Sequence, residues 1–216
     1  MSRPLPEDLD RILHDLRGPL NAVVMHLEVV KRLASDLPAA KSSLETIQSE
    51  IERVTQMLTA AFDVVALEPS ERGPVSLRAI LDEIATEPGL EQVTIGAAAA
   101  PEIRGERRLL RTALAHLVRD AVDATRKAQA ARPPEVSLDT TDASVTVVVR
   151  DWGVSFSSTN PRSVVRLPGA GGAGQRGANL MAVYRIARLH GGRLSVGSPG
   201  EPAEGAEVRL TLPREV

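Results

Sequence analysis

The chain has 216 residues and a formal net charge of -2, and its length and apolar content of 43% suffice for one large or two small domains with real cores. It has no cysteine, which excludes disulfides and thiolate metal sites, and with four aromatic residues and little net charge it lacks the basic field and stacking platform of a nucleic-acid-binding protein. No stretch reaches the roughly 18 to 20 apolar residues of a membrane span and the N-terminus has no apolar signal core, so we expect a cytoplasmic protein without membrane insertion.

The first predicted element is a long amphipathic helix whose apolar residues recur at alternating spacings of four and three, as in a coiled-coil seam. The seam consists of Leu9, Leu13, Leu16, Leu20, Val23, Leu27 and Val30. His14 lies just off this seam, and Asp15 beside it can take or orient its proton. An exposed helical histidine is usually an ordinary surface residue. Pro19 favours a functional interpretation here, because a proline inside a helix costs about 3 kcal/mol and needs a reason.

A turn at residues 35–38 separates this helix from a second one with its own apolar seam. The second seam consists of Leu44, Ile47, Ile51, Val54, Leu58, Ala61 and Val65. Two helices with one apolar face each cannot close a core, so residues 1–67 are predicted to form a homodimer, a four-helix bundle with His14 facing outward. Packing of the hairpin on the rest of the same chain is the alternative, since periodicity does not choose the partner.

The pattern changes after residues 68–76, a polar segment with proline and glycine that we interpret as a linker. Residues 77–216 are predicted to form a second domain with helices at 77–85, 107–129 and about 179–190, strands at 93–95, 136–138, 145–149, 193–196 and 207–212, and a glycine-rich loop at 169–177. Helices mixed with mostly antiparallel strands in this order indicate a two-layer α/β sandwich. The fold class of the whole chain is therefore α+β.

The segment HDLRGPL at residues 14–20 resembles the phosphoacceptor motif of bacterial two-component histidine kinases, which reads His, Glu or Asp, Leu, Arg, a small polar residue, Pro, Leu. The resemblance implies that His14 is the phosphorylated residue and that Asp15 assists attack on the phosphoryl group. Arg17 belongs to the same catalytic motif. Gly18 stands where the family often has Thr or Asn, whose side chain orients water during phosphatase activity.

The second domain resembles the ATP-binding domain of histidine kinases and of gyrase-type and chaperone-type ATPases. In the helical segment ALAHLVRDAVDAT, Asp120 stands at the position of an Asn that binds magnesium, and His116 lies one turn earlier on the same face. The resemblance implies ATP and Mg²⁺ as cofactors, with His116 in the cofactor site and Asp120 as the metal ligand. Aspartate is a suitable hard-oxygen ligand for Mg²⁺. The alternative is that Asp120 is an ordinary solvated helix acid.

The segment RDWGVSF resembles the adenine-binding box of the same family, which reads Asp, any residue, Gly, any residue, Gly. The resemblance implies that Asp151 accepts a hydrogen bond from the adenine amino group and that Gly153 lets the backbone approach the ring. Ser155 replaces the second glycine. An Asp and a Gly after a strand also form routine turns, which is the alternative interpretation.

The last box normally has three alternating glycines before a helix that ends in His-Gly-Gly. This chain has the ending at residues 189–192, and counting back places Gln175, Gly177 and Asn179 at the three glycine positions. The resemblance implies that Gly174 and Gly177 contribute backbone amides to a phosphate site. A simple flexible connector is the alternative for such a loop.

Together these segments predict a histidine kinase that autophosphorylates on His14 from ATP and passes the phosphoryl group to an aspartate of a response-regulator receiver domain. The main alternative is an ATP-independent histidine phosphotransferase of a phosphorelay with a degenerate ATPase domain. A pure dimerisation scaffold would leave the histidine motif unexplained. We also expect an upstream sensory partner, because the sequence has no sensory segment of its own.

Overall fold

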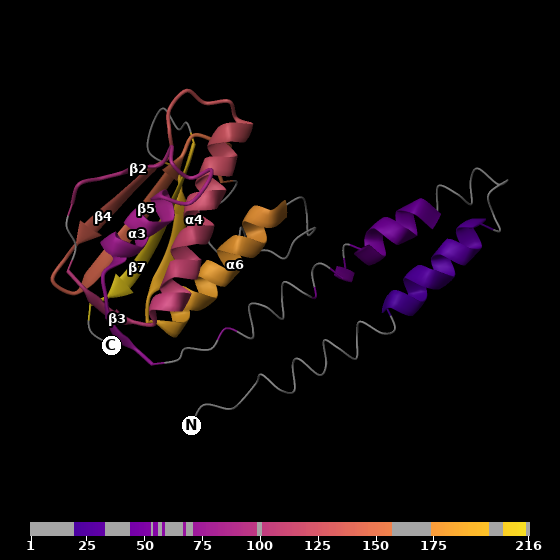
Figure 1. Cartoon of the computed structure of the whole chain (residues 1–216), viewed down its shortest axis with the longest axis horizontal. Helices are drawn as coiled ribbons and strands as arrows, with labels where there is room; N and C mark the ends of the chain where they lie inside the picture. The colour runs from indigo at the N-terminus through magenta and orange to yellow at the C-terminus, as the bar shows by residue number, and fades with distance from the viewer. Residues whose placement is uncertain are drawn as a thin grey trace. The chain divides into compact units, whose positions relative to one another are not determined.

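The computed structural model describes residues 20–32, 44–52, 54–55, 58, 67, 71–98, 101–156, 174–198 and 205–214 (Figure 1). The chain divides into two compact units, one formed by Met1–Ala66 with Leu167–Gly174 and the other by Leu67–Arg166 with Gln175–Val216. The predicted catalytic residues His14, Asp15 and Arg17 lie outside the described residues. Within those residues, no helix combines the length and the hydropathy needed to cross a membrane.

The first unit is helical over residues 20–32 and 44–52, in agreement with the two predicted helices. Leu27 and Leu44 are buried, and Lys31 Nζ donates a hydrogen bond to Gln48 Oε1 over 3.3 Å between the two helical segments. Other seam residues remain open, since 47% of Val23 is exposed. One chain therefore covers only part of the two apolar seams among these residues.

The second unit is a two-layer α/β sandwich, as predicted. Its elements are β1 (Gly73–Val75), α3 (Leu77–Ala85), β2 (Thr94–Ile95), β3 (Ile103–Gly105), α4 (Arg107–Lys127), β4 (Glu135–Thr140), β5 (Ser144–Asp151), α6 (Gly174–Leu189), β6 (Arg193–Gly197) and β7 (Ala206–Pro213). Five strands form a sheet in the order β2-β4-β5-β7-β6, in which β2 runs parallel to β4 and the other neighbours are antiparallel. In Figure 1, α3, α4 and α6 lie on one side of this sheet.

The core lies between the helices and the sheet. Strand β5 shows why, because Val145, Val147 and Val149 alternate with less buried residues and so place their side chains on one face. Leu114 of α4 and Ile186 of α6 are fully buried in the same cluster. Period-2 alternation in the strands and apolar stripes on the helices thus produce one continuous apolar layer.

The structure differs from the prediction at two places. Gly73–Val75, within the segment interpreted as linker, form β1, which pairs with the unpredicted strand β3. Val75 is buried, and its partner Ile103 comes from far along the chain, so this pairing depends on tertiary contact rather than on a local signal. Helix α6 begins at Gly174 instead of about residue 179, so the end of the predicted glycine-rich loop is helical.

Candidate nucleotide-binding site

The carboxylate of Asp151 lies buried at the end of β5, with 1% of the residue exposed. Its Oδ1 accepts a hydrogen bond of 2.9 Å from the backbone N–H of Gly153. The backbone N–H of Trp152 donates to Thr125 Oγ1 on α4 over 3.2 Å. These bonds fix the turn after β5 against α4 and hold a carboxylate where it can recognise an N–H donor.

Gly153 is required by this close approach to α4. A Cβ at this position would lie 2.8 Å from the Cβ of Ala124 and 3.0 Å from Asp151 Oδ1. Ser155, which replaces the second glycine of the motif, donates from Oγ to the carbonyl of Gly205 over 2.7 Å. The substituted serine therefore ties the turn to the start of β7, beside an open cavity of about 450 Å³.

The predicted metal ligand Asp120 lies on α4, where it is buried. Its Oδ1 accepts a hydrogen bond of 2.6 Å from Asn179 Nδ2 on α6. Asp120 and Ala124 are one turn apart on the same face of α4, and Gly153 packs on Ala124. The turn that carries Asp151 and the Asp120–Asn179 pair therefore lie along one face of one helix.

His116 lies a further turn toward the start of α4 and is half-buried. Burial lowers the pKa of His116 below its ordinary value, and the positive charge of Arg119 lowers it further. The imidazole is therefore neutral at neutral pH. It can offer a hydrogen bond to a ligand but no positive charge.

Magnesium fits this arrangement only as an ion that takes most of its ligands from elsewhere. Among the described residues, no group of three or more His, Asp or Glu side chains is placed to hold a metal. Mg²⁺ at nucleotide sites is commonly held by one or two carboxylates together with phosphate oxygens and water. The Asp120 carboxylate has the correct chemistry for such a ligand.

Gly174 and Gly177 lie in the first turn of α6 rather than in a loop. The first turn of an α-helix has N–H groups without intrahelical acceptors, and these groups attract anions. The structure thus changes the predicted conformation of the two glycines. Gly174 is the first helical residue and keeps a free N–H of the kind that phosphates use, whereas Gly177 is the fourth, where the i→i−4 bonds of the helix begin.

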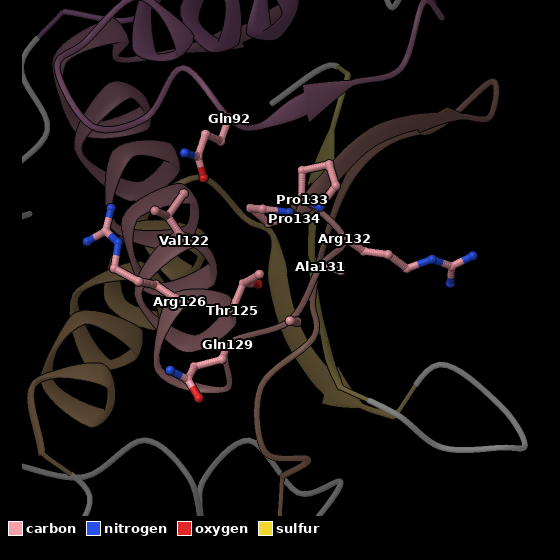
Figure 2. A pocket seen from close by; sticks show the side chains of 10 residues that line it. Gln92, Val122, Thr125, Arg126, Gln129, Ala131, Arg132, Pro133 and Pro134 are labelled. Carbon is pink, nitrogen blue, oxygen red and sulfur yellow. The ribbon is translucent and has the colours of Figure 1, made fainter.

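A second cavity, of about 560 Å³, lies beside the end of α4 and the loop that leads to β4 (Figure 2). Figure 2 shows Thr125 and Arg126 on the helix side of this cavity and Arg132 and Pro133 on the loop side. The loop is held by Trp152, whose indole Nε1 donates to the carbonyl of Pro133 over 2.7 Å.

The Trp152 ring also contacts two arginines that the sequence reading did not single out. The guanidinium carbons of Arg150 and Arg132 lie 4.3 and 5.0 Å from the ring centroid, within cation–π distance. The sequence signal for Trp152 was its position between Asp151 and Gly153. Trp152 thus fixes the Pro133 loop, which lines the cavity of Figure 2.

His190, in the His-Gly-Gly ending of the last box, has a structural role. It is buried, its Nε2 accepts a hydrogen bond of 3.0 Å from the backbone N–H of Glu106, and its Nδ1 lies 2.8 Å from the carbonyl oxygen of Ile186. The partners assign the hydrogen to Nδ1. Burial lowers the pKa of His190, Arg72 adds to this, and the Ile186 carbonyl and Glu106 oppose it.

Comparison with known proteins identifies the family of the second unit. The family model described as "Histidine kinase-, DNA gyrase B-, and HSP90-like ATPase" matches residues 105–216. The sensor histidine kinase MtrB of Mycobacterium tuberculosis is 28% identical over 94% of this chain and 38% of its own length. The sensor-like histidine kinase SenX3 of the same species is 25% identical over 94% of this chain and 52% of its own length. The chain thus spans less than two thirds of either relative.

Solved structures show the same fold. Full-length ShkA in complex with AMPPNP superposes with a TM-score of 0.60 at 21% identity and covers 96% of this chain and 45% of its own. The histidine kinase AdeS of Acinetobacter baumannii gives a TM-score of 0.54 at 13% identity, over 93% of this chain and 98% of its own. From its matched segment, which is more than half of its length, the chain belongs to the histidine kinase-, DNA gyrase B- and HSP90-like ATPase family.

Proposed function

We propose that this chain is the phosphotransfer core of a two-component kinase that binds ATP, phosphorylates His14 and passes the phosphoryl group to an aspartate of a response-regulator receiver domain. The observation that carries the proposal is the common placement of two motif acids. Asp120 of α4 and the turn that carries Asp151, far apart in the sequence, lie along the same face of α4. In the proposal, one nucleotide contacts both.

In this proposal, the buried carboxylate of Asp151 accepts a hydrogen bond from the adenine amino group and so fixes the base. Asp120 holds Mg²⁺, which neutralises charge on the phosphates when it is bound. His116 supplies a hydrogen bond, and the amides at the start of α6, including that of Gly174, face the phosphates. These groups contribute positioning and electrostatic stabilisation, which are the main sources of catalysis in phosphoryl transfer.

The chemical step is an in-line displacement. An imidazole nitrogen of His14 forms a bond to the γ-phosphorus of ATP while the bond from that phosphorus to the bridging oxygen breaks, and ADP leaves. Asp15 takes or orients the proton of the imidazole, and Arg17 belongs to the same motif. In the second step, an aspartate oxygen of the receiver domain displaces His14 from phosphorus.

We further propose that the first unit forms a homodimer through its helical hairpin. Val23, Val30, Ile47 and Val54 are the support, because these seam residues keep between 42% and 48% of their surface exposed in one chain. The two seams of a second copy would cover the exposed parts of these two seams in a four-helix bundle. An upstream sensory partner would supply the signal, and a reaction that uses ATP and a receiver domain would take place in the cytoplasm.

The test uses wild type, His14→Ala and Asp151→Ala with ATP labelled at the γ-phosphate. Of these three proteins, we expect only wild type to carry acid-labile label and to transfer that label to a receiver domain. His26→Ala is the matched histidine control, and it should be labelled to the same extent as wild type. If wild type takes no label from ATP, but His14 is labelled by a phosphorylated receiver domain, the kinase proposal is wrong and the ATP-independent phosphotransferase replaces it.

A further inference from the structure

Two departures from the family's nucleotide motifs are in direct contact in this protein. The resemblance puts an Asn at position 120 and a Gly at position 179, whereas this chain has Asp and Asn. The amide of Asn179 donates to Asp120 Oδ1 over 2.6 Å, across 59 positions of the sequence. Position 120 of α4 thus lacks the carboxamide of the motif, and the aspartate there is hydrogen-bonded to the carboxamide of Asn179 from α6.

A buried aspartate at this position carries a cost that an asparagine does not. Its charge is desolvated, because only 9% of Asp120 is exposed, and it would add to the negative charge of a bound polyphosphate. A short N–H donor from Asn179 offsets part of the negative charge and fixes the carboxylate rotamer.

We infer that Asn179 is a positioning residue that makes Asp120 usable as the metal ligand of the nucleotide site. The inference rests on the proposed function, because it concerns the binding of magnesium with ATP. It joins the two departures into one feature. An Asp at 120 requires a donor at 179, whereas the Asn–Gly pair of the motif needs none because a neutral carboxamide carries no charge to offset.

The experiment is calorimetric titration with Mg-ATP and, separately, with ADP in the presence of EDTA. Asn179→Gly and Asn179→Leu both remove the donor, and leucine keeps the size of asparagine. We expect both variants to bind Mg-ATP about tenfold more weakly than wild type while metal-free ADP binds with unchanged affinity. Asp120→Asn combined with Asn179→Gly restores the motif's own pair and should return Mg-ATP affinity to that of wild type.

Asp123→Asn is the matched control, because it removes an exposed acid from the same helix and should leave both affinities unchanged. Mg-ATP affinity in Asn179→Gly and Asn179→Leu equal to that of wild type overturns the inference and leaves the proposed function standing. The inference is also overturned if the double variant binds Mg-ATP as weakly as Asn179→Gly alone, because the effect then comes from the backbone of α6 and not from Asp120. Wild type that binds no Mg-ATP overturns both the inference and the kinase proposal.

Discussion

The two units of this protein differ in how they cover their apolar residues. In the second unit, Leu114 and Ile186 are fully buried between helices and sheet by residues of the same chain. In the first unit, Val23 and Ile47 lie on the predicted seams and are about half exposed. Among the described residues, the same kind of apolar periodicity thus gives full burial in the second unit and partial burial in the first, which is the difference expected if the proposed dimer covers the rest.

The largest effect is expected from the complete core. Leu114→Ala removes a fully buried side chain from the middle of α4 and should lower the free energy of unfolding of the second unit by about 2 to 5 kcal/mol. Urea unfolding at two protein concentrations measures it, and the loss should be the same at both. Val154→Ala is the control, because that side chain is 85% exposed. A loss that changes with protein concentration would mean that this core is also shared between chains.

The next effect concerns Gly205, which packs against Asp151 at the end of β5 in the candidate nucleotide site. Gly205 has a φ of +91°, and a Cβ there would lie 1.9 Å from the carbonyl oxygen of Asp151. Gly205→Ala should cost about 1 to 3 kcal/mol from the overlap, in addition to about 1 kcal/mol from the left-handed backbone. Gly89→Ala isolates the backbone term, because Gly89 has a φ of +84° and no atom within 4 Å of the added Cβ. Equal unfolding free energies for the two variants would show that the turn yields without cost.

A somewhat smaller effect is expected from the buried histidine. His190→Ala leaves the backbone N–H of Glu106 without its acceptor and should cost about 1 to 3 kcal/mol at neutral pH. Because the pKa of His190 is lowered in the folded protein, the unfolded chain binds the proton first as the pH falls. The stabilisation is complete above the ordinary value of 6.5 and is lost as the pH falls from there through the folded pKa.

Urea midpoints between about pH 8 and pH 5 test this sign. His190→Ala should flatten the decrease at acid pH, and His116, whose pKa is also lowered, should contribute to the part that remains. An unchanged decrease in the variant would contradict the assignment to His190.

The smallest effect is expected in the incomplete core. Val23→Ala should change stability by less than about 0.5 kcal/mol at low protein concentration, because much of this side chain is exposed in one chain. At higher concentration the variant should fall further behind wild type as a second copy covers the seam. Circular dichroism of thermal unfolding across a dilution series measures this, with Met25→Ala, 71% exposed and off the seam, as the control. A difference independent of concentration would argue against the dimer.

Much of the fold could be predicted because the signals are local. The apolar spacing of α3 predicts its observed bounds, and alternation in β5 and β7 predicts both strands and the buried face. The two short strands β1 and β3 could not be found, because each has three residues and is defined by its pairing with the other. The early start of α6 was missed because glycine is a poor helix former and a glycine-rich segment favours a loop.

The candidate site was predicted less completely than the fold. The segment RDWGVSF led to Asp151 and Gly153, which the structure places against α4. The contact between Asp120 and Asn179 could not be predicted, because two departures in separate motifs carry no sign that they meet. The role of Trp152 in holding the Pro133 loop was missed for the same reason, since its partners are defined only by tertiary packing.

The anchored indole also has a practical consequence. Trp152 is the only tryptophan of the chain, and it lies between Asp151 and Gly153. Indole emission depends on the charges around the ring, and here the ring lies close to the guanidinium groups of Arg132 and Arg150. The protein therefore contains its own spectroscopic reporter, and nucleotide bound at the proposed site should change its intrinsic fluorescence without an added label.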